Sequence, residues 1–116
     1  MIFIIDDDEI MAECIAKACQ QKTLTFSNAV EAMHAISDNK IPQLIFLDIL
    51  LDGPDGFTFL HELMSYTDTA QIPIVIISSL DFKQQNLSTY GVVGTLDKST
   101  MTPQEIRSYA EKYCTK

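Results

Sequence analysis

The sequence predicts a doubly wound α/β domain, with a five-stranded parallel sheet and five helices, on three observations. Short apolar runs alternate with longer amphipathic runs along all 116 residues. Three of the five apolar runs show no polar alternation, as expected of strands buried on both faces of a parallel sheet. Helical patterns separate successive strands, which makes the strands parallel and the crossovers right-handed. The length fits one domain spanning residues 1–116.

The predicted strands are apolar runs of four or five residues, bounded by polar residues or turn signals. They are Ile2–Ile5, Thr23–Phe26, Leu44–Leu47, Ile74–Ile77 and Val92–Leu96.

The first two helices are predicted from apolar stripes at helical spacing. The stripe of the first helix comprises Met11, Cys14, Ile15, Ala18 and Cys19. The second begins at Ser27 or Asn28, because Asn28 and Glu31 have capping-box spacing. Its inward-facing residues are Ala29, Ala32, Met33 and Ile36.

Three further helices complete the alternation. One follows Asp55-Gly56 and buries Phe57, Leu60, Leu63 and Met64. A short, weakly patterned helix lies around Phe82–Tyr90. The last has the strongest signals, with Thr102 as cap, Pro103 at the first helical position and Glu105 completing a capping box. Its stripe comprises Ile106, Tyr109, Ala110 and Tyr113.

Charge excludes some classes of partner. Sixteen acidic residues outnumber eight basic ones, for a net charge of −8. Nucleic acids and anionic membrane surfaces would repel this charge, so neither is expected as a direct partner. The excess is uneven: residues 1–58 carry ten acidic and three basic residues, which points to a site in the first half.

Three cysteines, Cys14, Cys19 and Cys114, are too few and too irregularly spaced for a disulfide framework or a CxxC metal site. Reduced thiols in a cytoplasmic protein are expected, with Cys14 and Cys19 as packing residues. The apolar runs are too short to span a bilayer, and Met1–Ile5 lacks the basic flank of a signal peptide.

Polar residues cluster where the predicted strands end. Asp6 and Asp7 follow the first strand, Asp48 the third, Ser78 the fourth and Lys98 the fifth. These ends share one rim of a parallel sheet, where such folds place their functional groups. Oxygen ligands without His or Cys select Mg²⁺. A divalent cation, an ammonium and a hydroxyl would cradle a phosphoryl group, with a carboxylate as nucleophile.

The chain resembles a response-regulator receiver domain of two-component signalling over nearly its whole length. The matching stretches are IFIIDDDE, LIFLDILLDGPDG, PIVIISS and GTLDKS, in this order and spacing. The resemblance implies a flavodoxin-like fold with strand order 2-1-3-4-5. It also implies a phosphorylated signalling protein rather than an enzyme, which takes its phosphoryl group from a sensor histidine kinase or a histidine phosphotransfer protein and switches binding of an output protein.

The resemblance also implies residue roles. Asp48 resembles the phosphoacceptor, and Asp7 the direct Mg²⁺ ligand, with Asp6 beside it. The carbonyl of Leu50 resembles a further ligand. Lys98 resembles the lysine that pairs with phosphoryl oxygens, and Ser78 the hydroxyl that starts the switch. A stand-alone receiver, monomeric or weakly dimeric, is expected.

Three departures from the family pattern affect the switch and two loops. Receivers usually have a cis proline after this lysine, but here Ser99 follows, which predicts a trans bond. Thr95 stands at the switch position, which is usually aromatic, and Asp52 where a proline is usual.

Two alternative functions remain. One is a receiver-like interaction module that signals without phosphate, suggested by Thr95 and Ser99. The other is a Mg²⁺-dependent phosphatase acting on small molecules, which is disfavoured because Leu50 stands where the common phosphatase motif has a second acid.

Overall fold

The computed structural model describes residues 1–38, 40–48, 62–63, 65, 69–78 and 91–114. Within them, five parallel strands form one sheet in the order β2-β1-β3-β4-β5, which confirms the predicted fold class. The strands are β1 (Ile2–Ile5), β2 (Thr23–Phe26), β3 (Leu44–Asp48), β4 (Ile74–Ser78) and β5 (Val92–Asp97). The helices are α1 (Glu9–Cys19), α2 (Ala29–Ser37) and α4 (Pro103–Tyr113).

Two predicted helices fall largely or wholly outside the described residues. Of the helix predicted after Asp55-Gly56, the structure describes a helical turn at Glu62 and Leu63, and Leu63 is fully buried as predicted. The helix predicted around Phe82–Tyr90 lies outside the described part of the chain.

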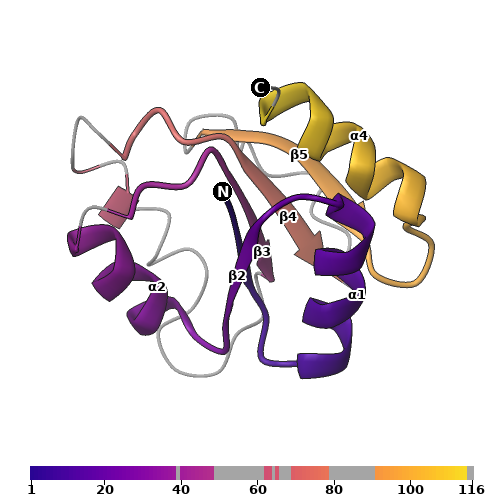
Figure 1. The fold of residues 1–116 in the computed structure, drawn as a ribbon, viewed down its shortest axis with the longest axis horizontal. Helices are drawn as coiled ribbons and strands as arrows, with labels where there is room; N and C mark the ends of the chain where they lie inside the picture. The colour runs from indigo at the N-terminus through magenta and orange to yellow at the C-terminus, as the bar shows by residue number, and fades with distance from the viewer. Residues whose placement is uncertain (39, 49–61, 64, 66–68, 79–90, 115–116) are drawn as a thin grey trace.

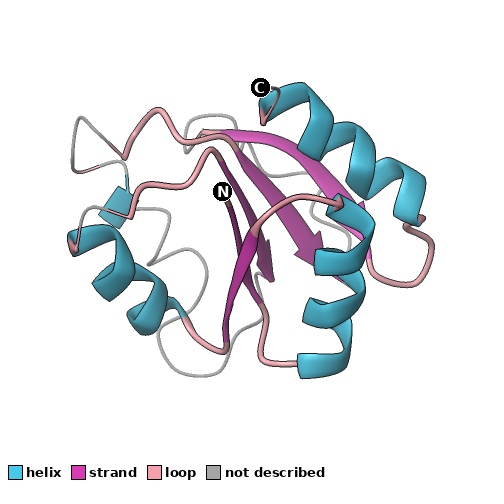
Figure 2. Ribbon diagram, in the orientation of Figure 1, coloured by secondary structure: helices cyan, strands magenta, loops and turns pink. Residues whose placement is uncertain are grey.

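Helices cover both faces of the sheet (Figures 1 and 2). Alternate residues of β1 enter two apolar layers: Phe3 and Ile5 pack towards α2, whereas Ile2 and Ile4 pack towards α1 and α4. All four side chains are fully buried, as expected for a parallel sheet between two helical layers. The three central strands are thereby held rigidly, with their carboxyl ends at one rim.

Side-chain caps begin each described helix. Asp8 accepts hydrogen bonds from the backbone N–H groups of Ile10 and Met11 at the start of α1. Asn28 accepts one from Glu31, as predicted for α2. Thr102 and Glu105 form the predicted capping box of α4, in which each side chain accepts from the other's backbone N–H. Local sequence signals therefore fix where these helices begin.

One prediction for α1 is wrong. Cys14 is exposed, and the buried stripe consists of Ala12, Ile15, Ala18 and Cys19. The stripe lies where α1 meets both the sheet and α4, and Cys14 is turned away from that line. Cys19 and Cys114 are buried, and burial raises the pKa of the Cys19 thiol to about 12, so it remains protonated at neutral pH.

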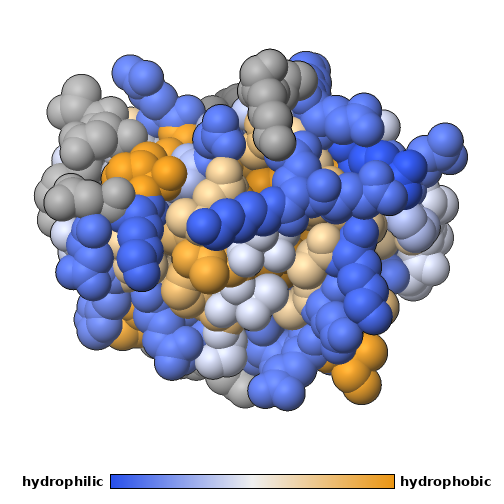
Figure 3. Space-filling model, in the orientation of Figure 1, coloured by the Kyte–Doolittle hydropathy of each residue, from blue (hydrophilic) through white to orange (hydrophobic). Residues whose placement is uncertain are grey.

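The surface in Figure 3 carries mostly hydrophilic side chains, with small apolar areas between them. Within the described residues, no helix combines the length and apolar character needed to cross a bilayer.

Gly94 lies at a bulge in β5, close to Tyr109 of α4. The register shifts between Ile74 and Val75 of β4, so that Val75 pairs with Gly94 rather than with Val93. Gly94 then lies directly under the ring of Tyr109 in α4, and a Cβ at this position would overlap that ring. The close approach of α4 to the edge strand therefore requires a residue without a side chain.

We expect Gly94→Ala to lower the free energy of unfolding by about 1–3 kcal/mol through overpacking. Chemical denaturation of Gly94→Ala, Tyr109→Ala and the double variant measures this effect. Removing the Tyr109 ring should cancel most of the cost of the added methyl group. An alanine at position 94 that costs the same with or without the ring would contradict this explanation.

Candidate functional site

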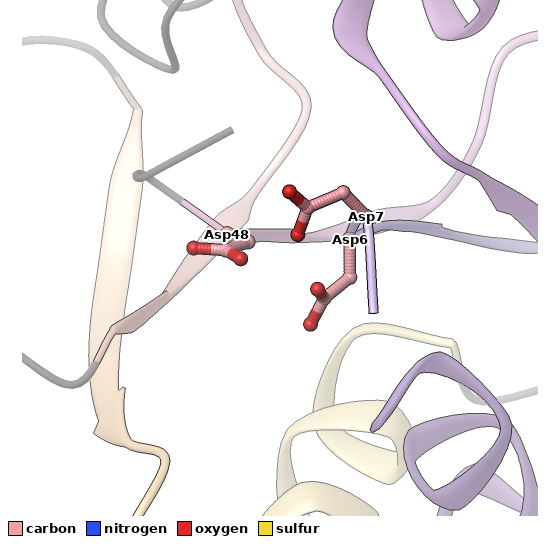
Figure 4. Close-up of side chains that lie close together, drawn as sticks. All are labelled: Asp6, Asp7 and Asp48. Atoms are coloured by element: carbon pink, nitrogen blue, oxygen red, sulfur yellow. The ribbon is translucent and has the colours of Figure 1, made fainter. Parts of the chain in front are cut away.

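Neighbouring strands bring the predicted acidic residues together. Ile5 of β1 pairs with Leu47 of β3, so the next residues, Asp6 just after β1 and Asp48 at the end of β3, lie at the same level. A carboxylate oxygen from each of Asp6, Asp7 and Asp48 lies within 4.8 Å of the others. Figure 4 shows the three carboxylates gathered beyond the ends of these two strands. The structure therefore assembles the acidic cluster that the sequence predicted.

The three acids differ in exposure. Asp6 and Asp48 are 3% and 4% exposed, whereas Asp7 is exposed. Buried carboxylates need partners, because desolvation disfavours an isolated charge. Asp7 can instead meet solvent while its carboxylate remains beside the other two.

Lys98 supplies the positive charge. Its ammonium donates a hydrogen bond to Asp48 Oδ2 at 2.9 Å and lies 3.3 Å from Asp6 Oδ2. Burial of the ammonium disfavours its charge, but the hydrogen bond to Asp48 and the two carboxylates outweigh this effect, so the pKa of Lys98 is raised. Lys98 is thus a fixed cation at neutral pH, bridging residues that are 50 and 92 positions away in the sequence.

The pKa of Asp6 is strongly perturbed. Burial raises its pKa from 3.8 to about 6, helped by the nearby charge of Asp48. The backbone N–H of Asp8, which donates to Asp6 Oδ1 at 2.9 Å, and the Lys98 ammonium act in the opposite direction. Asp6 Oδ2 is buried and accepts no hydrogen bond within the described part of the chain. The Lys98 ammonium, 3.3 Å away, offsets its charge, but one ammonium faces three carboxylates, so the site keeps a net negative charge.

The run of acids after β1 divides into two roles. Asp6 and Asp7 join the cluster with Asp48, whereas Asp8 caps α1. Glu9 lies in the first turn of α1, where the helix dipole favours a negative charge. Helix capping and the helix dipole therefore account for Asp8 and Glu9, but not for the two preceding residues.

The other predicted site residues are described to different extents. Ser78 ends β4, and its backbone pairs with Asp97 of β5, which places it at the same rim. Thr95 lies in β5 and is exposed. Leu50, Asp52 and the side chain of Ser78 lie outside the described part of the structure. Their proposed roles therefore remain predictions.

The loop after β5 contains an interaction that the sequence analysis missed. Asp97 Oδ1 accepts hydrogen bonds from the backbone N–H of Ser99 at 2.8 Å and from its hydroxyl at 2.6 Å. No peptide bond among the described residues is cis, so Lys98–Ser99 is trans as predicted. The spacing Asp-x-Ser after a strand is a turn signal that could have revealed this bond.

The donor set suits a hard divalent cation. Three carboxylates converge without His or Cys, and one buried oxygen lacks a hydrogen bond. Mg²⁺ or Mn²⁺ favours oxygen ligands of this kind. A cation there, together with the Lys98 ammonium, would place two positive centres beside Asp48, an arrangement that stabilises an anion such as a phosphoryl group.

Known proteins resemble this chain in sequence or in structure. Response regulator PleD from Caulobacter vibrioides is 29% identical over 82 residues, which are 69% of this chain but 18% of PleD. The receiver domain of NtrX from Brucella abortus is 27% identical and superposes with a TM-score of 0.77, covering 97% of each chain. The receiver domain of sensor histidine kinase PA1611 from Pseudomonas aeruginosa, solved with a magnesium ion in its active site cleft, is 15% identical. It superposes with a TM-score of 0.79 over 97% of this chain and 94% of that one.

A family-wide sequence pattern extends the similarity beyond single relatives. The pattern described as "Response regulator receiver domain" matches residues 2–111. Receiver domains are signalling domains, not classical enzymes, and they interact with histidine kinases and phosphotransfer proteins. With the sheet order and the match over most of the sequence, the chain belongs to the response regulator receiver domain family.

Proposed function

We propose that Asp48 accepts a phosphoryl group in a reaction that requires Mg²⁺ held by Asp6, Asp7 and Asp48. The donor is a phosphohistidine on a sensor histidine kinase or a phosphotransfer protein. The observation that carries the proposal is the 2.9 Å hydrogen bond between Lys98 and the buried Asp48, beside two further carboxylates. A binding module that signals without phosphate would not need these charges to converge.

The proposed step is a displacement at phosphorus. A carboxylate oxygen of Asp48 forms a bond to phosphorus, while the P–N bond of the phosphohistidine breaks and leaves its electron pair on the imidazole. The product is an acyl phosphate on Asp48. The metal, when bound, would neutralise phosphoryl oxygens; Asp6 would hold it through water, and the backbone carbonyl of Leu50 is a proposed further ligand.

Lys98 and Ser78 take the remaining proposed roles. Lys98 exchanges its bond with Asp48 for one with a phosphoryl oxygen, which keeps its ammonium paired. Ser78 lies at the end of β4 beside Asp97, at the same rim as Lys98, and its hydroxyl would hydrogen-bond another phosphoryl oxygen. Movement of these two residues would shift a two-state surface near α4 and the helix predicted around Phe82–Tyr90, where the output protein binds, with Thr95 as the switch position.

The match to the receiver domain family supports a signalling role for the chain. The chain spans 18% of PleD, so the activity of that whole protein does not transfer. We propose a cytoplasmic setting, where a kinase domain can reach Asp48. A monomer or weak dimer would suffice, because all charged groups of the site come from one chain.

We expect the chain to gain the mass of one phosphoryl group when incubated with a small phosphodonor, such as an acyl phosphate, and Mg²⁺. Intact-mass spectrometry measures the adduct. Asp48→Asn should abolish it, because an amide oxygen is not a competent nucleophile. Asp38→Asn, the same change at the exposed end of α2, is the matched control and should leave the adduct unchanged.

Two results would contradict the assignment of Asp48. The first is a wild-type chain that gains no phosphate under these conditions. The second is an adduct that persists in Asp48→Asn, which would place the phosphoryl group on another residue.

We expect Mg²⁺ to raise the melting temperature, and to do so more at about pH 8 than at about pH 5. A ligand that binds only the folded state adds about 2.7 kcal/mol of stability when its free concentration is about 100 times its Kd. Because the pKa of Asp6 is raised to about 6, protons compete with the cation below that pH. Thermal unfolding with and without Mg²⁺ at both pH values measures the difference.

The metal-free chain should show the opposite trend with pH. The pKa of Asp6 in the folded state exceeds its ordinary value of 3.8, so the folded state binds more protons between these values and loses stability as pH rises to about 6. Asp6→Asn should remove this loss and weaken the effect of Mg²⁺, whereas Glu111→Gln on the exposed face of α4 should change neither. An equal Mg²⁺ effect in the wild type and in Asp6→Asn would argue against a shared site.

A further inference from the structure

The loop between β5 and α4 is built around one side chain. Asp97 ends β5, and both hydrogen bonds to its Oδ1 come from Ser99, through the backbone N–H and the hydroxyl. Its backbone carbonyl accepts two more, from the N–H groups of Thr100 at 3.1 Å and Met101 at 2.8 Å. Four hydrogen bonds thus converge on Asp97 and close a tight turn around Lys98.

Both ends of this turn are anchored in the core. Leu96, just before it, is buried between the sheet and the helices, and Met101, just after it, packs against the same apolar cluster. Thr102 then begins α4 through its capping box. The backbone of Lys98 therefore has fixed neighbours on either side.

Ser99 also engages the carboxylate that is nearest to Lys98 in the sequence. Asp97 is adjacent in sequence and its carboxylate is exposed, so it could compete for the ammonium in solvent. Instead, its Oδ1 is engaged by Ser99, and the ion pairs of Lys98 within the described residues are with Asp48 and Asp6. The hydrogen bonds from Ser99 also lower the pKa of Asp97, which keeps it ionised at neutral pH.

We propose that Asp97, through its two hydrogen bonds with Ser99, is a positioning residue that holds Lys98 in reach of Asp48. This inference rests on the proposed phosphoacceptor function, in which Lys98 must exchange Asp48 for a phosphoryl oxygen. A free lysine side chain has many rotamers, and a fixed turn removes the backbone freedom that would add to them. The Asp97–Ser99 pair achieves this with a trans peptide bond.

The test compares phosphorylation rates and the order of the Lys98 side chain in four variants. With a small phosphodonor and Mg²⁺, Asp97→Ala should react about five- to tenfold more slowly, the effect of losing one or two hydrogen bonds. The maximal rate should fall while Mg²⁺ affinity stays unchanged, because Asp97 does not belong to the acidic cluster. Asp97→Asn retains an oxygen acceptor for both Ser99 donors and should restore the wild-type rate. Glu111→Ala removes an exposed acid from α4 and is the control for surface charge.

A second readout is independent of phosphate transfer. The NMR order parameter of the Lys98 Cε–H groups in the metal-free chain should fall in Asp97→Ala and recover in Asp97→Asn. If the wild type accepts no phosphate, the proposed function fails, but this measurement still decides the positioning role. If Asp97→Ala does not fold, Ser99→Ala replaces it in the test. This variant removes only the hydroxyl bond and should show the same changes in milder form.

Two outcomes would overturn the inference. Wild-type rate and wild-type Lys98 order in Asp97→Ala would show that the turn is not needed. An Asp97→Asn variant as slow and as disordered as Asp97→Ala would show that charge at position 97, rather than its hydrogen bonds to Ser99, affects Lys98.

Discussion

The pairing of the Lys98 ammonium with two buried carboxylates is the interaction on which the site depends. Asp6 and Asp48 are each less than 5% exposed, and two such anions side by side would repel each other without a cation. Lys98 compensates them incompletely: one ammonium faces the carboxylates of Asp6, Asp7 and Asp48, and the pKa of Asp6 remains raised. The folded chain thus retains excess negative charge at a defined place, which favours binding of a further cation.

The sheet order dictates which residue can provide this compensation. Asp6 and Asp48 leave adjacent strands, but Lys98 follows the edge strand β5, with β4 between it and β3. Neighbouring strands lie about 4.8 Å apart, so a side chain after β5 must reach across about two strand spacings. The long side chain of lysine can meet the Asp48 side chain between the two strands, provided that the loop carrying it is fixed. The turn around Asp97 and the capping box of α4 meet that condition.

Most of the framework was predictable because it follows from short-range patterns. Uninterrupted apolar runs such as Ile2–Ile5 predict buried parallel strands, and the spacing of Thr102 and Glu105 predicts a capped helix. The acidic cluster followed from the rule that parallel strands end at one rim. The exposure of Cys14 was not predicted. The apolar spacing in the sequence does not show whether Cys14 or its neighbour Ile15 faces the sheet and α4. The bonds between Asp97 and Ser99 were not predicted, although the spacing Asp-x-Ser after a strand is a turn signal.

The pH titration of the Asp6 carboxyl carbon by NMR tests the central claim most directly. In the metal-free chain, the account predicts a midpoint near pH 6, well above the ordinary value of 3.8. Replacing Lys98 with methionine, which keeps the apolar stem but removes the charge, should move the midpoint higher still. A midpoint near the ordinary value in the wild type, or one that does not change in Lys98→Met, would contradict the view that a lysine bridge compensates two buried acids.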